Sequence, residues 1–331
     1  MTAVRRRRFL IATAGVLAAP IASFAQQQAG SIRRIGFLGF ASAGGFYTEP
    51  LEGFREGLRE LGYIEGRTIA FEYKFADEKE ERVAPLAAEL VRNKVNVIVT
   101  HGTLETRAAK LATNSIPIVM ASVGDPVGAG LVASLARPGG NITGVTNMDV
   151  GLGAKRLGLL KEVVSKFSRV AVLRNPDNPS SHLQYKETQA AAQTLGIEIR
   201  LLDVRDPKEF DGGFPAMSKA RADALVVLGD SLFLSRRKQI ASLALKNRLP
   251  SVFAKDEMVV AGGLMSYGPT LVGLYRDAAT YVDKILKGAS PGGLPIEQPT
   301  KFELAINLQT AKALGITFPQ SVQISADKVI Q

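Results

Sequence analysis

The run Arg34-Ile35-Gly36-Phe37-Leu38 is matched, much later in the chain, by Arg169-Val170-Ala171-Val172-Leu173. Each run places a cation before a short block of apolar or small residues, and each is followed by an alternation of apolar blocks with amphipathic stretches. Continuous apolar blocks of this length are typical of strands in a parallel sheet that helices cover on both faces. The pattern therefore predicts two similar α/β units in one chain.

The first unit shows the alternation clearly. Leu51, Phe54, Leu58 and Leu61 recur at helical spacing, and Gly62 suits the left-handed residue that ends a helix. We expect strands at 35–39, 68–73, 95–100 and 116–121, and further helices at 80–92 and 103–113.

The second unit repeats this order. After the strand at 169–173, a helix ends at Thr194-Leu195-Gly196, and strands are expected at 197–202, 224–228 and 250–253. A helix is expected at 278–287, and 302–331 returns to pack on the body. Glycine-rich stretches at 139–144 and 261–263 suggest where the chain crosses between units. The predicted fold class is α/β, with two Rossmann-like, doubly wound lobes whose parallel sheets are joined by crossing strands: 32–143 plus 264–295 form one lobe, and 144–263 plus 296–331 the other.

The N-terminus has the features of a secretory signal peptide over residues 1–25. A basic block, 5–8, precedes a short apolar stretch, 9–19, and small residues lead to an expected cleavage after Ala25. The apolar stretch is too short to span a membrane. Arg6-Arg7-Arg8-Phe9-Leu10 also fits the twin-arginine export pattern, and the sequence leaves an ordinary signal and a twin-arginine signal equally open.

Composition narrows the function classes. The chain has 331 residues, of which 46% are hydrophobic, enough for packed cores rather than a disordered chain. Its net charge of +10 includes the four arginines of the signal, and the remaining +6 is spread among acidic residues, so we expect no nucleic-acid partner. The absence of Cys excludes thiolate metal sites, disulfides and a lipid attachment site, and it suits a free protein of the oxidising periplasm.

Three local patterns resemble catalytic or cofactor motifs. Residues 128–133 satisfy G-x-G-x-x-A, but they do not follow their strand directly, so we interpret them as packing glycines at a helix start. Residues 288–292 satisfy G-x-S-x-G but follow a helix, which indicates a surface turn. His101 and His182 lack metal-ligand spacing, and we expect no metal and no cofactor.

Polar and small residues follow the strands of both units, where open α/β sheets bind ligands. Hydroxyls, amides and helix-start N–H groups suit a carboxylate, Asp125 or Asp230 suits an amine, and Phe40, Phe46, Tyr47, Phe233 and Tyr267 are candidates for stacking on the ligand. Helix capping is the alternative role for each polar residue. The predicted ligand-binding residues are Ser42, Tyr47, Gly102, Thr103, Ser122, Asp125, Asn175, Asn178, Ser180, Asp230, Ser231 and Tyr267.

Longer motifs carry a resemblance to a known family. They are residues 116–119 (IPIV), 124–144 (GDPVGAGLVASLARPGGNITG), 261–268 (AGGLMSYG), 294–303 (LPIEQPTKFE) and 307–315 (NLQTAKALG). In these the chain resembles the ABC-transporter substrate-binding protein family that includes tryptophan-binding proteins. The resemblance implies a type I periplasmic binding protein, with a ligand held between the lobes. Arg174 stands where the family tends to an apolar residue, and it would hold a carboxylate if it faced the cleft.

From these features we expect a monomeric periplasmic receptor that is not an enzyme. It would capture a small aromatic or amino-acid-like carboxylate by hinge closure and deliver it to an inner-membrane ABC permease with a cytoplasmic ATPase. Two other hypotheses remain, a secreted enzyme on the same scaffold and the effector-sensing domain of a regulator. The enzyme would need a base beside a nucleophile, with His101 the only candidate base, and the regulator a DNA-binding segment where this chain has its signal.

Overall fold

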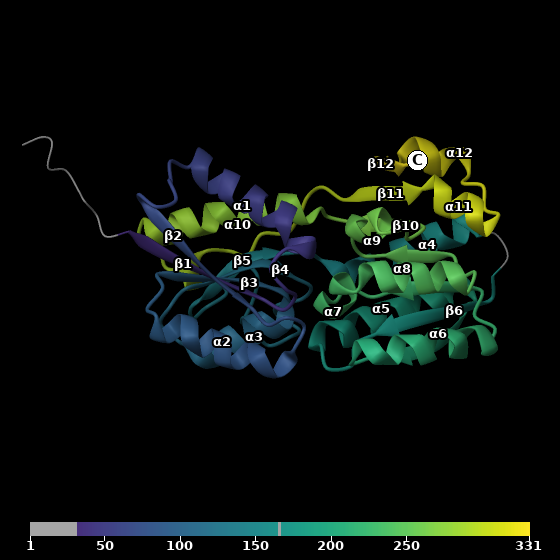
Figure 1. Ribbon diagram of the computed structural model, residues 1–331, viewed down its shortest axis with the longest axis horizontal. Coiled ribbons are helices and arrows are strands. Elements are labelled where there is room, and N and C mark those ends of the chain that lie inside the picture. Colours follow the sequence, from purple (N-terminus) through teal and green to yellow (C-terminus); the bar gives the residue numbers. More distant parts are fainter. Residues whose placement is uncertain (1–31, 165–166) are drawn as a thin grey trace, which may run out of the picture.

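The computed structural model describes residues 32–164 and 167–331, which form two α/β lobes side by side (Figure 1). The predicted signal peptide lies outside the described residues. Each lobe has its own sheet, with strand order β2-β1-β3-β4-β5 in the first lobe and β12-β11-β10-β9-β8-β6-β7 in the second. The predicted two-lobe α/β fold is confirmed.

The first lobe has an entirely parallel sheet. Its strands are β1 (Arg33–Gly39), β2 (Ile69–Phe75), β3 (Val97–His101), β4 (Ile118–Val123) and β5 (Ile142–Thr146). Its helices are α1 (Thr48–Glu60), α2 (Glu80–Arg92), α3 (Gly102–Ala112) and α10 (Leu271–Leu286), with a short 3-10 turn, η2 (Gly45–Tyr47). Helices α2 and α3 cover one face of the sheet, and α1 and α10 cover the other (Figure 1).

Close packing joins α1 to α10, although these helices are far apart in the sequence. A Cβ atom at Gly53 would lie 2.9 Å from Val272 Cγ1, and one at Gly57 would lie 3.0 Å from Ala279 Cβ. The two glycines therefore allow the helices to approach each other closely. Helix α10 begins seven residues before the expected 278, because Thr270 caps it by accepting a hydrogen bond from the Gly273 N–H.

The second lobe has a larger sheet in which β10 and β11 are antiparallel and the other pairs are parallel. Its strands are β6 (Arg169–Arg174), β7 (Glu198–Asp203), β8 (Ala224–Val227), β9 (Ser251–Phe253), β10 (Met265–Gly268), β11 (Glu303–Asn307) and β12 (Lys328–Ile330). Its helices are α4 (Gly153–Val163), α5 (Pro179–Leu195), α6 (Phe210–Lys219), α7 (Ser231–Ser235), α8 (Arg237–Lys246), α9 (Asp256–Val260), α11 (Leu308–Leu314) and α12 (Gln320–Ser325).

Strand β6 shows how the predicted apolar block produces this layered structure. Val170 and Val172 belong to the apolar cluster that includes α4, whereas Ala171 and Leu173 belong to the cluster that includes α6. Successive side chains of a strand point to opposite faces, so a continuous apolar run fills the core on both sides of the sheet.

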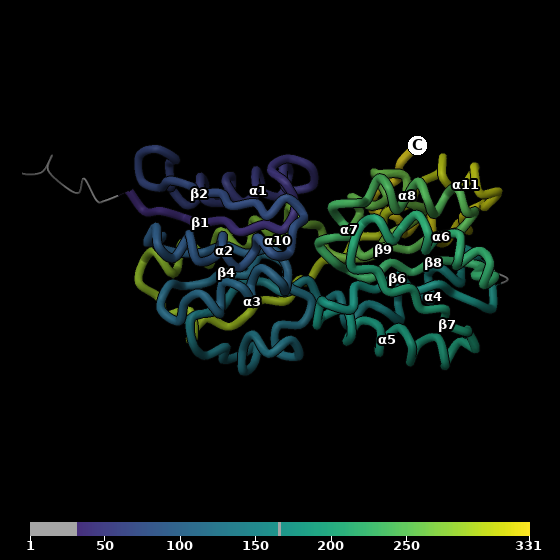
Figure 2. The backbone as a smooth tube through the Cα atoms, turned by 60° about the horizontal axis from the view of Figure 1, so that its bottom comes forward, coloured from purple at the N-terminus to yellow at the C-terminus, as the bar shows by residue number. Residues whose placement is uncertain are grey.

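The chain crosses between the lobes three times, and two crossings differ from the expected positions. Strand β5 remains in the first sheet up to Thr146, so the first crossing follows at 147–149. Strand β10 pairs with β9 and β11 in the second sheet, so the second crossing follows it, at 269–270. The third crossing lies at 298–302, after Glu297 has bridged to Val145. Figure 2 shows the two lobes apart from each other, with the yellow C-terminal segment back in the second lobe.

The segment 128–133 was expected to begin a helix, and this expectation was wrong. These residues form turns and irregular structure after β4. Asp125 explains the local conformation, because its Oδ1 accepts hydrogen bonds from the N–H groups of Val127 and Gly128 and holds a turn in place of a helix.

Candidate ligand-binding site

A cavity of about 550 Å³, including its opening to solvent, lies between the two lobes. It is lined at the carboxyl ends of strands from both sheets, by segments that follow β3, β4, β6, β8 and β9. Its size falls within the range of small-molecule sites, and its position is the one where open α/β sheets bind ligands.

The first lobe contributes small residues to the cavity. His101 ends β3, and Gly102 begins α3 with a φ of +84°, so the backbone turns directly from strand to helix at the cavity wall. Thr103, Ser122 and Gly124 complete this wall. The N-terminus of α3 therefore faces the cavity with its positive helix end.

The second lobe contributes amides and a carboxylate at two helix starts. Asn178 caps α5 by accepting a hydrogen bond from Ser180 N–H at 3.0 Å, and its Nδ2 donates to Asp230 Oδ2 at 2.7 Å. Asp230 caps α7 by accepting a hydrogen bond from Leu232 N–H at 2.9 Å. Burial raises the pKa of Asp230, although the hydrogen bond from Asn178 opposes this shift. One set of bonds thus fixes both helix starts at the cavity.

Apolar side chains form the rest of the second-lobe wall. Phe233 and Phe253 are almost completely buried and line the cavity together with Leu234 and Met258. A site that combines such a surface with a few fixed polar groups suits a ligand with one apolar part and one polar part.

A buried charged cluster lies at the first crossing. Arg156 donates to Asp149 Oδ1 at 2.7 Å and to the Tyr267 carbonyl oxygen at 2.8 Å, so it connects the first crossing to the end of β10. Lys255 Nζ lies 3.6 Å from the same Asp149 oxygen. Both lysine and aspartate line the cavity.

Two further titratable groups lie where the lobes meet. Burial, followed by the charge of Lys255, lowers the pKa of His101 to about 3, so its ring is neutral at ordinary pH. Its Nδ1 lies 2.9 Å from Tyr275 Oη. Burial raises the pKa of Glu105 to about 8, and Glu105 Oε1 lies 3.4 Å from Ser231 Oγ of the other lobe.

The structure brings together many of the predicted binding residues at this cavity. Those that line it are Gly102, Thr103, Ser122, Asn178, Ser180, Asp230 and Ser231. They share one feature, a position at the carboxyl end of a strand or around the start of the following helix.

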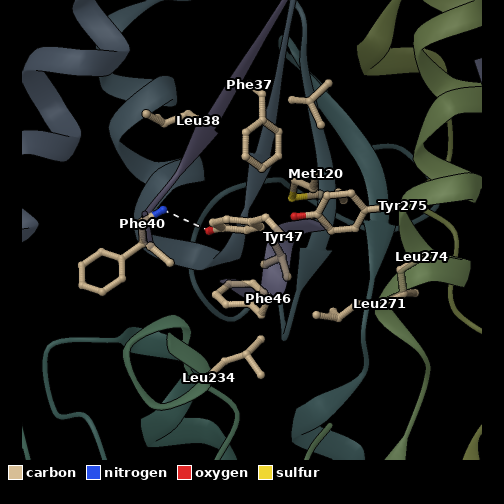
Figure 3. Packing of buried hydrophobic residues seen from close by; sticks show 14 of the residues in the cluster. Phe37, Leu38, Phe40, Phe46, Tyr47, Met120, Leu234, Leu271, Leu274 and Tyr275 are labelled. Carbon is tan, nitrogen blue, oxygen red and sulfur yellow. Dashed lines mark hydrogen bonds between the residues drawn. The ribbon is translucent and has the colours of Figure 1, made fainter. Parts of the chain in front are cut away.

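Other predicted residues lie away from the cavity. Tyr47 is buried in the first-lobe core, where its Oη accepts a hydrogen bond from Phe40 N–H (Figure 3). Tyr267 stacks on Phe302, and Ser42 is exposed. Aromatic character and loop position did not reveal which way these side chains point.

Asp125 and Asn175 also do not line the cavity, for a different reason. Asp125 stabilises the turn after β4, and Asn175 lines a neighbouring cavity between the lobes and donates to Asp230. Arg174 is bound by Asp203 through two hydrogen bonds of 2.7 Å and does not line the cavity either.

Several lining residues were not among the predicted ligand-binding residues. Asn147 and Asp149 come from the first crossing, Gln184 from the second turn of α5, and Lys255 from the residue before α9. Gln184 makes two hydrogen bonds to Gly229. Its Oε1 accepts from the Gly229 N–H, and its Nε2 donates to the Gly229 carbonyl oxygen. Lys255 follows a strand, as Asp230 does, and its position beyond the strand end was visible in the sequence, but it was not included among the predicted ligand-binding residues.

Within residues 32–164 and 167–331, no group of three or more His, Asp or Glu side chains is placed to hold a metal ion. In the same part of the chain no helix has both the length and the apolar character needed to cross a membrane.

Comparison with known proteins identifies relatives of known structure and name. A family model described as ABC transporter substrate binding protein matches residues 37–330. A tyrosine-binding protein of Clostridioides difficile (strain R20291) is 28% identical over 278 residues, which cover 84% of this chain and 78% of that protein.

Two solved structures cover 91% of this chain and 100% of their own. One is an ABC domain from Streptococcus pneumoniae in complex with L-Trp, with a TM-score of 0.84 and 28% identity. The other is the ligand-free, open structure of a substrate-binding protein with adhesive properties from Clostridium difficile, with a TM-score of 0.65 and 25% identity. Proteins of the matched family are extracytoplasmic receptors that bind a solute for an ABC transporter and are not enzymes. The chain belongs to the ABC transporter substrate-binding protein family.

Proposed function

We propose that this receptor captures an amino-acid-like carboxylate with an apolar or aromatic side chain, by closure of the two lobes around it. The observation that carries the proposal is the cavity itself. One wall offers hydroxyls and a helix N-terminus, the other offers Asp230 and buried aromatic rings, and both lobes are needed to enclose it.

The polar groups suit the two charged ends of an amino acid. The N–H groups at the start of α3, with Thr103 and Ser122, are donors for a carboxylate. Asp230 is a carboxylate at the opposite lobe and suits an ammonium group. Phe233 and Phe253 offer apolar surface for the side chain. The names of two relatives, a tyrosine-binding protein and a complex with L-Trp, support this ligand class.

Contacts between the lobes support closure as the capture step. Ser231 of the second lobe lies against Glu105 of the first, and Arg236 forms an ion pair with Glu78 across the interface. A Cβ atom on Gly124 would lie 2.2 Å from Ser180 Oγ, which leaves no room for a larger residue there.

Two relatives of nearly equal identity strengthen this interpretation. The L-Trp complex superposes on this chain with a TM-score of 0.84, whereas the open, ligand-free structure gives 0.65. A rotation of two otherwise similar lobes lowers a global superposition, so the difference supports a closed arrangement here.

The ligand class is tested by thermal shift and calorimetry with L-tryptophan, L-tyrosine, L-phenylalanine, aliphatic amino acids, aromatic acids and sugars. We expect one or more aromatic amino acids to raise the melting temperature, since a ligand that binds only the folded state stabilises it by mass action. X-ray scattering with and without that ligand should show a more compact particle when it is bound. The proposal would be contradicted if only sugars raised the melting temperature, or if the scattering profile were the same with and without the ligand.

We further propose that residues 1–25 direct export to the periplasm, where the monomeric receptor meets an inner-membrane permease. Mass spectrometry of the exported protein should show a chain whose first residue is Gln26. Substitution of Arg6 and Arg7 by Lys should block export if the twin-arginine route is used and leave it unchanged otherwise.

A further inference from the structure

Lys255 is a buried lysine at the ligand cavity. It precedes α9 at the carboxyl end of β9, and only 6% of its surface is exposed. Within the described residues its Nζ has no hydrogen-bond partner. Burial lowers the pKa of Lys255, because an ammonium without a hydrogen-bond partner is costly in the interior, and an anion that arrives in the cavity would restore the charged form.

The nearest carboxylate does not fill this role. Asp149 Oδ1 accepts a hydrogen bond from Arg156 at 2.7 Å, and Lys255 Nζ is 3.6 Å from that same oxygen, beyond hydrogen-bond range. The side chains of Arg156 and Asp149 are almost completely buried. Two cations thus share one carboxylate, and Arg156 has the better geometry.

Neighbouring groups leave this excess of positive charge in place. Asp256 forms an ion pair with Lys328 at 2.7 Å. Burial raises the pKa of Glu257 to about 8, so this carboxyl carries little charge at neutral pH. His101 is neutral, as described above. None of these groups supplies a second anion to Lys255.

We propose that Lys255 binds the anionic group of the solute and makes that group a requirement for binding. This inference rests on the proposed function, because it names the residue that selects for the carboxylate. A neutral analogue would leave the buried ammonium unpaired, and sites built this way discriminate strongly against ligands that lack the partner. The uncharged N–H groups at the start of α3 would favour a carboxylate more weakly.

The test compares each acid with its neutral amide. L-tyrosine and L-tyrosinamide, L-tryptophan and L-tryptophanamide, and 4-hydroxybenzoate and 4-hydroxybenzamide are titrated by calorimetry into the full mature chain and into Lys255→Met. We expect the wild-type protein to prefer the acid by at least about 100-fold. Lys255→Met should lose most of its affinity for the acid, change less than about threefold towards the amide, and so lose the preference.

Controls separate this effect from misfolding. Lys246→Met removes an exposed lysine at the end of α8 in the same lobe, and it should keep the preference for the acid. Lys255→Gln keeps a polar side chain of similar length, and it should fold and show the same loss of preference if Lys255→Met does not fold.

The outcomes distinguish the two proposals. An unchanged preference for the acid in both Lys255 variants would overturn the role of Lys255 while the amino-acid ligand stands. Lysine-dependent binding of 4-hydroxybenzoate without binding of amino acids would support Lys255 and overturn the ligand class. Binding of the amides alone, or of no acid at all, would overturn both.

Discussion

The two lobes share a topology but contribute different chemistry to the site. The order β2-β1-β3-β4 in the first sheet matches β7-β6-β8-β9 in the second. At the ends of these strands, however, the first lobe presents Gly102, Thr103 and Ser122, whereas the second presents Asp230 and Lys255. The same scaffold therefore provides a small-residue surface that can close over a ligand and a charged surface that can select it.

The residues that support the cavity wall also differ between the two lobes. In the first lobe, the ring of Tyr47 packs edge-to-face on Phe37 (Figure 3). The same ring lies beside His101, so the wall rests on a tightly packed aromatic core. In the second lobe, the wall is held by the ion pair of Arg156 with Asp149 and by the hydrogen bond that Asn178 donates to Asp230. Loss of a charged side chain should therefore lower the free energy of unfolding more in the second lobe than in the first.

Asp149→Asn should give the largest effect on stability. The substitution leaves Arg156 and Lys255 buried without a carboxylate, and breaking a buried pair in this way costs about 3–5 kcal/mol in the free energy of unfolding. Urea unfolding followed by circular dichroism measures the change. Glu52→Gln in the first lobe breaks the exposed pairs with Arg55 and Arg59 and should cost less than about 1 kcal/mol. Equal losses in the two variants would contradict the contrast between the lobes.

Gly124→Ala should mainly reduce ligand affinity. Its added methyl group would meet Ser180 Oγ across the interface, so the closed state is disfavoured while each lobe still folds. We expect the dissociation constant for the ligand found in the screen to rise at least tenfold, which is a loss of about 1.4 kcal/mol of binding free energy. Calorimetry measures this change. Gly158→Ala places a methyl group in open space on α4 and should leave affinity unchanged. Wild-type affinity in Gly124→Ala would show that the lobes do not close this tightly.

Glu105→Gln should change how stability depends on pH. The carboxyl keeps its proton up to a pKa of about 8 in the folded protein, against 4.5 when it is free in the unfolded chain. Between these values the unfolded state binds fewer protons, so the free energy of unfolding falls as pH rises. The wild-type melting temperature should fall by about 3–6 °C more than that of Glu105→Gln between pH 5 and pH 8.5.

An exposed glutamate serves as the control for this pH measurement. Glu187→Gln should leave the wild-type slope unchanged, because the Glu187 side chain is in solvent. The raised pKa values of Asp230 and Glu257 add a slope that all three proteins share. Identical slopes in the wild type and Glu105→Gln would show that Glu105 is not held protonated between the lobes.

The sequence predicted those features that depend on local pattern. Apolar blocks located the strands, and the rule that ligands lie beyond strand ends predicted Thr103, Ser122 and Asp230, which line the cavity. The cluster of Asp149 and Arg156 could not be predicted, because it joins the first crossing to a helix whose arginine reads as a surface residue. Local pattern also gives no direction for an aromatic residue in a turn, so Tyr47 looked like a ligand contact although it packs inward.

The ion pair between Arg236 and Glu78 should have the smallest effect. It joins the second lobe to the first, but the Arg236 side chain is 41% exposed and that of Glu78 is 18% exposed. Exposed pairs contribute about 0–1 kcal/mol, so Arg236→Gln should weaken ligand binding by less than about fivefold, and by less still at high salt because ions screen the pair. Glu78→Gln should give the same loss, and the double variant should be no weaker than either single variant if the two side chains act only on each other. A loss above tenfold would instead make this pair a principal latch of the closed state, so that the lobes would be held by charge at the rim as well as by the fit of Gly124 against Ser180.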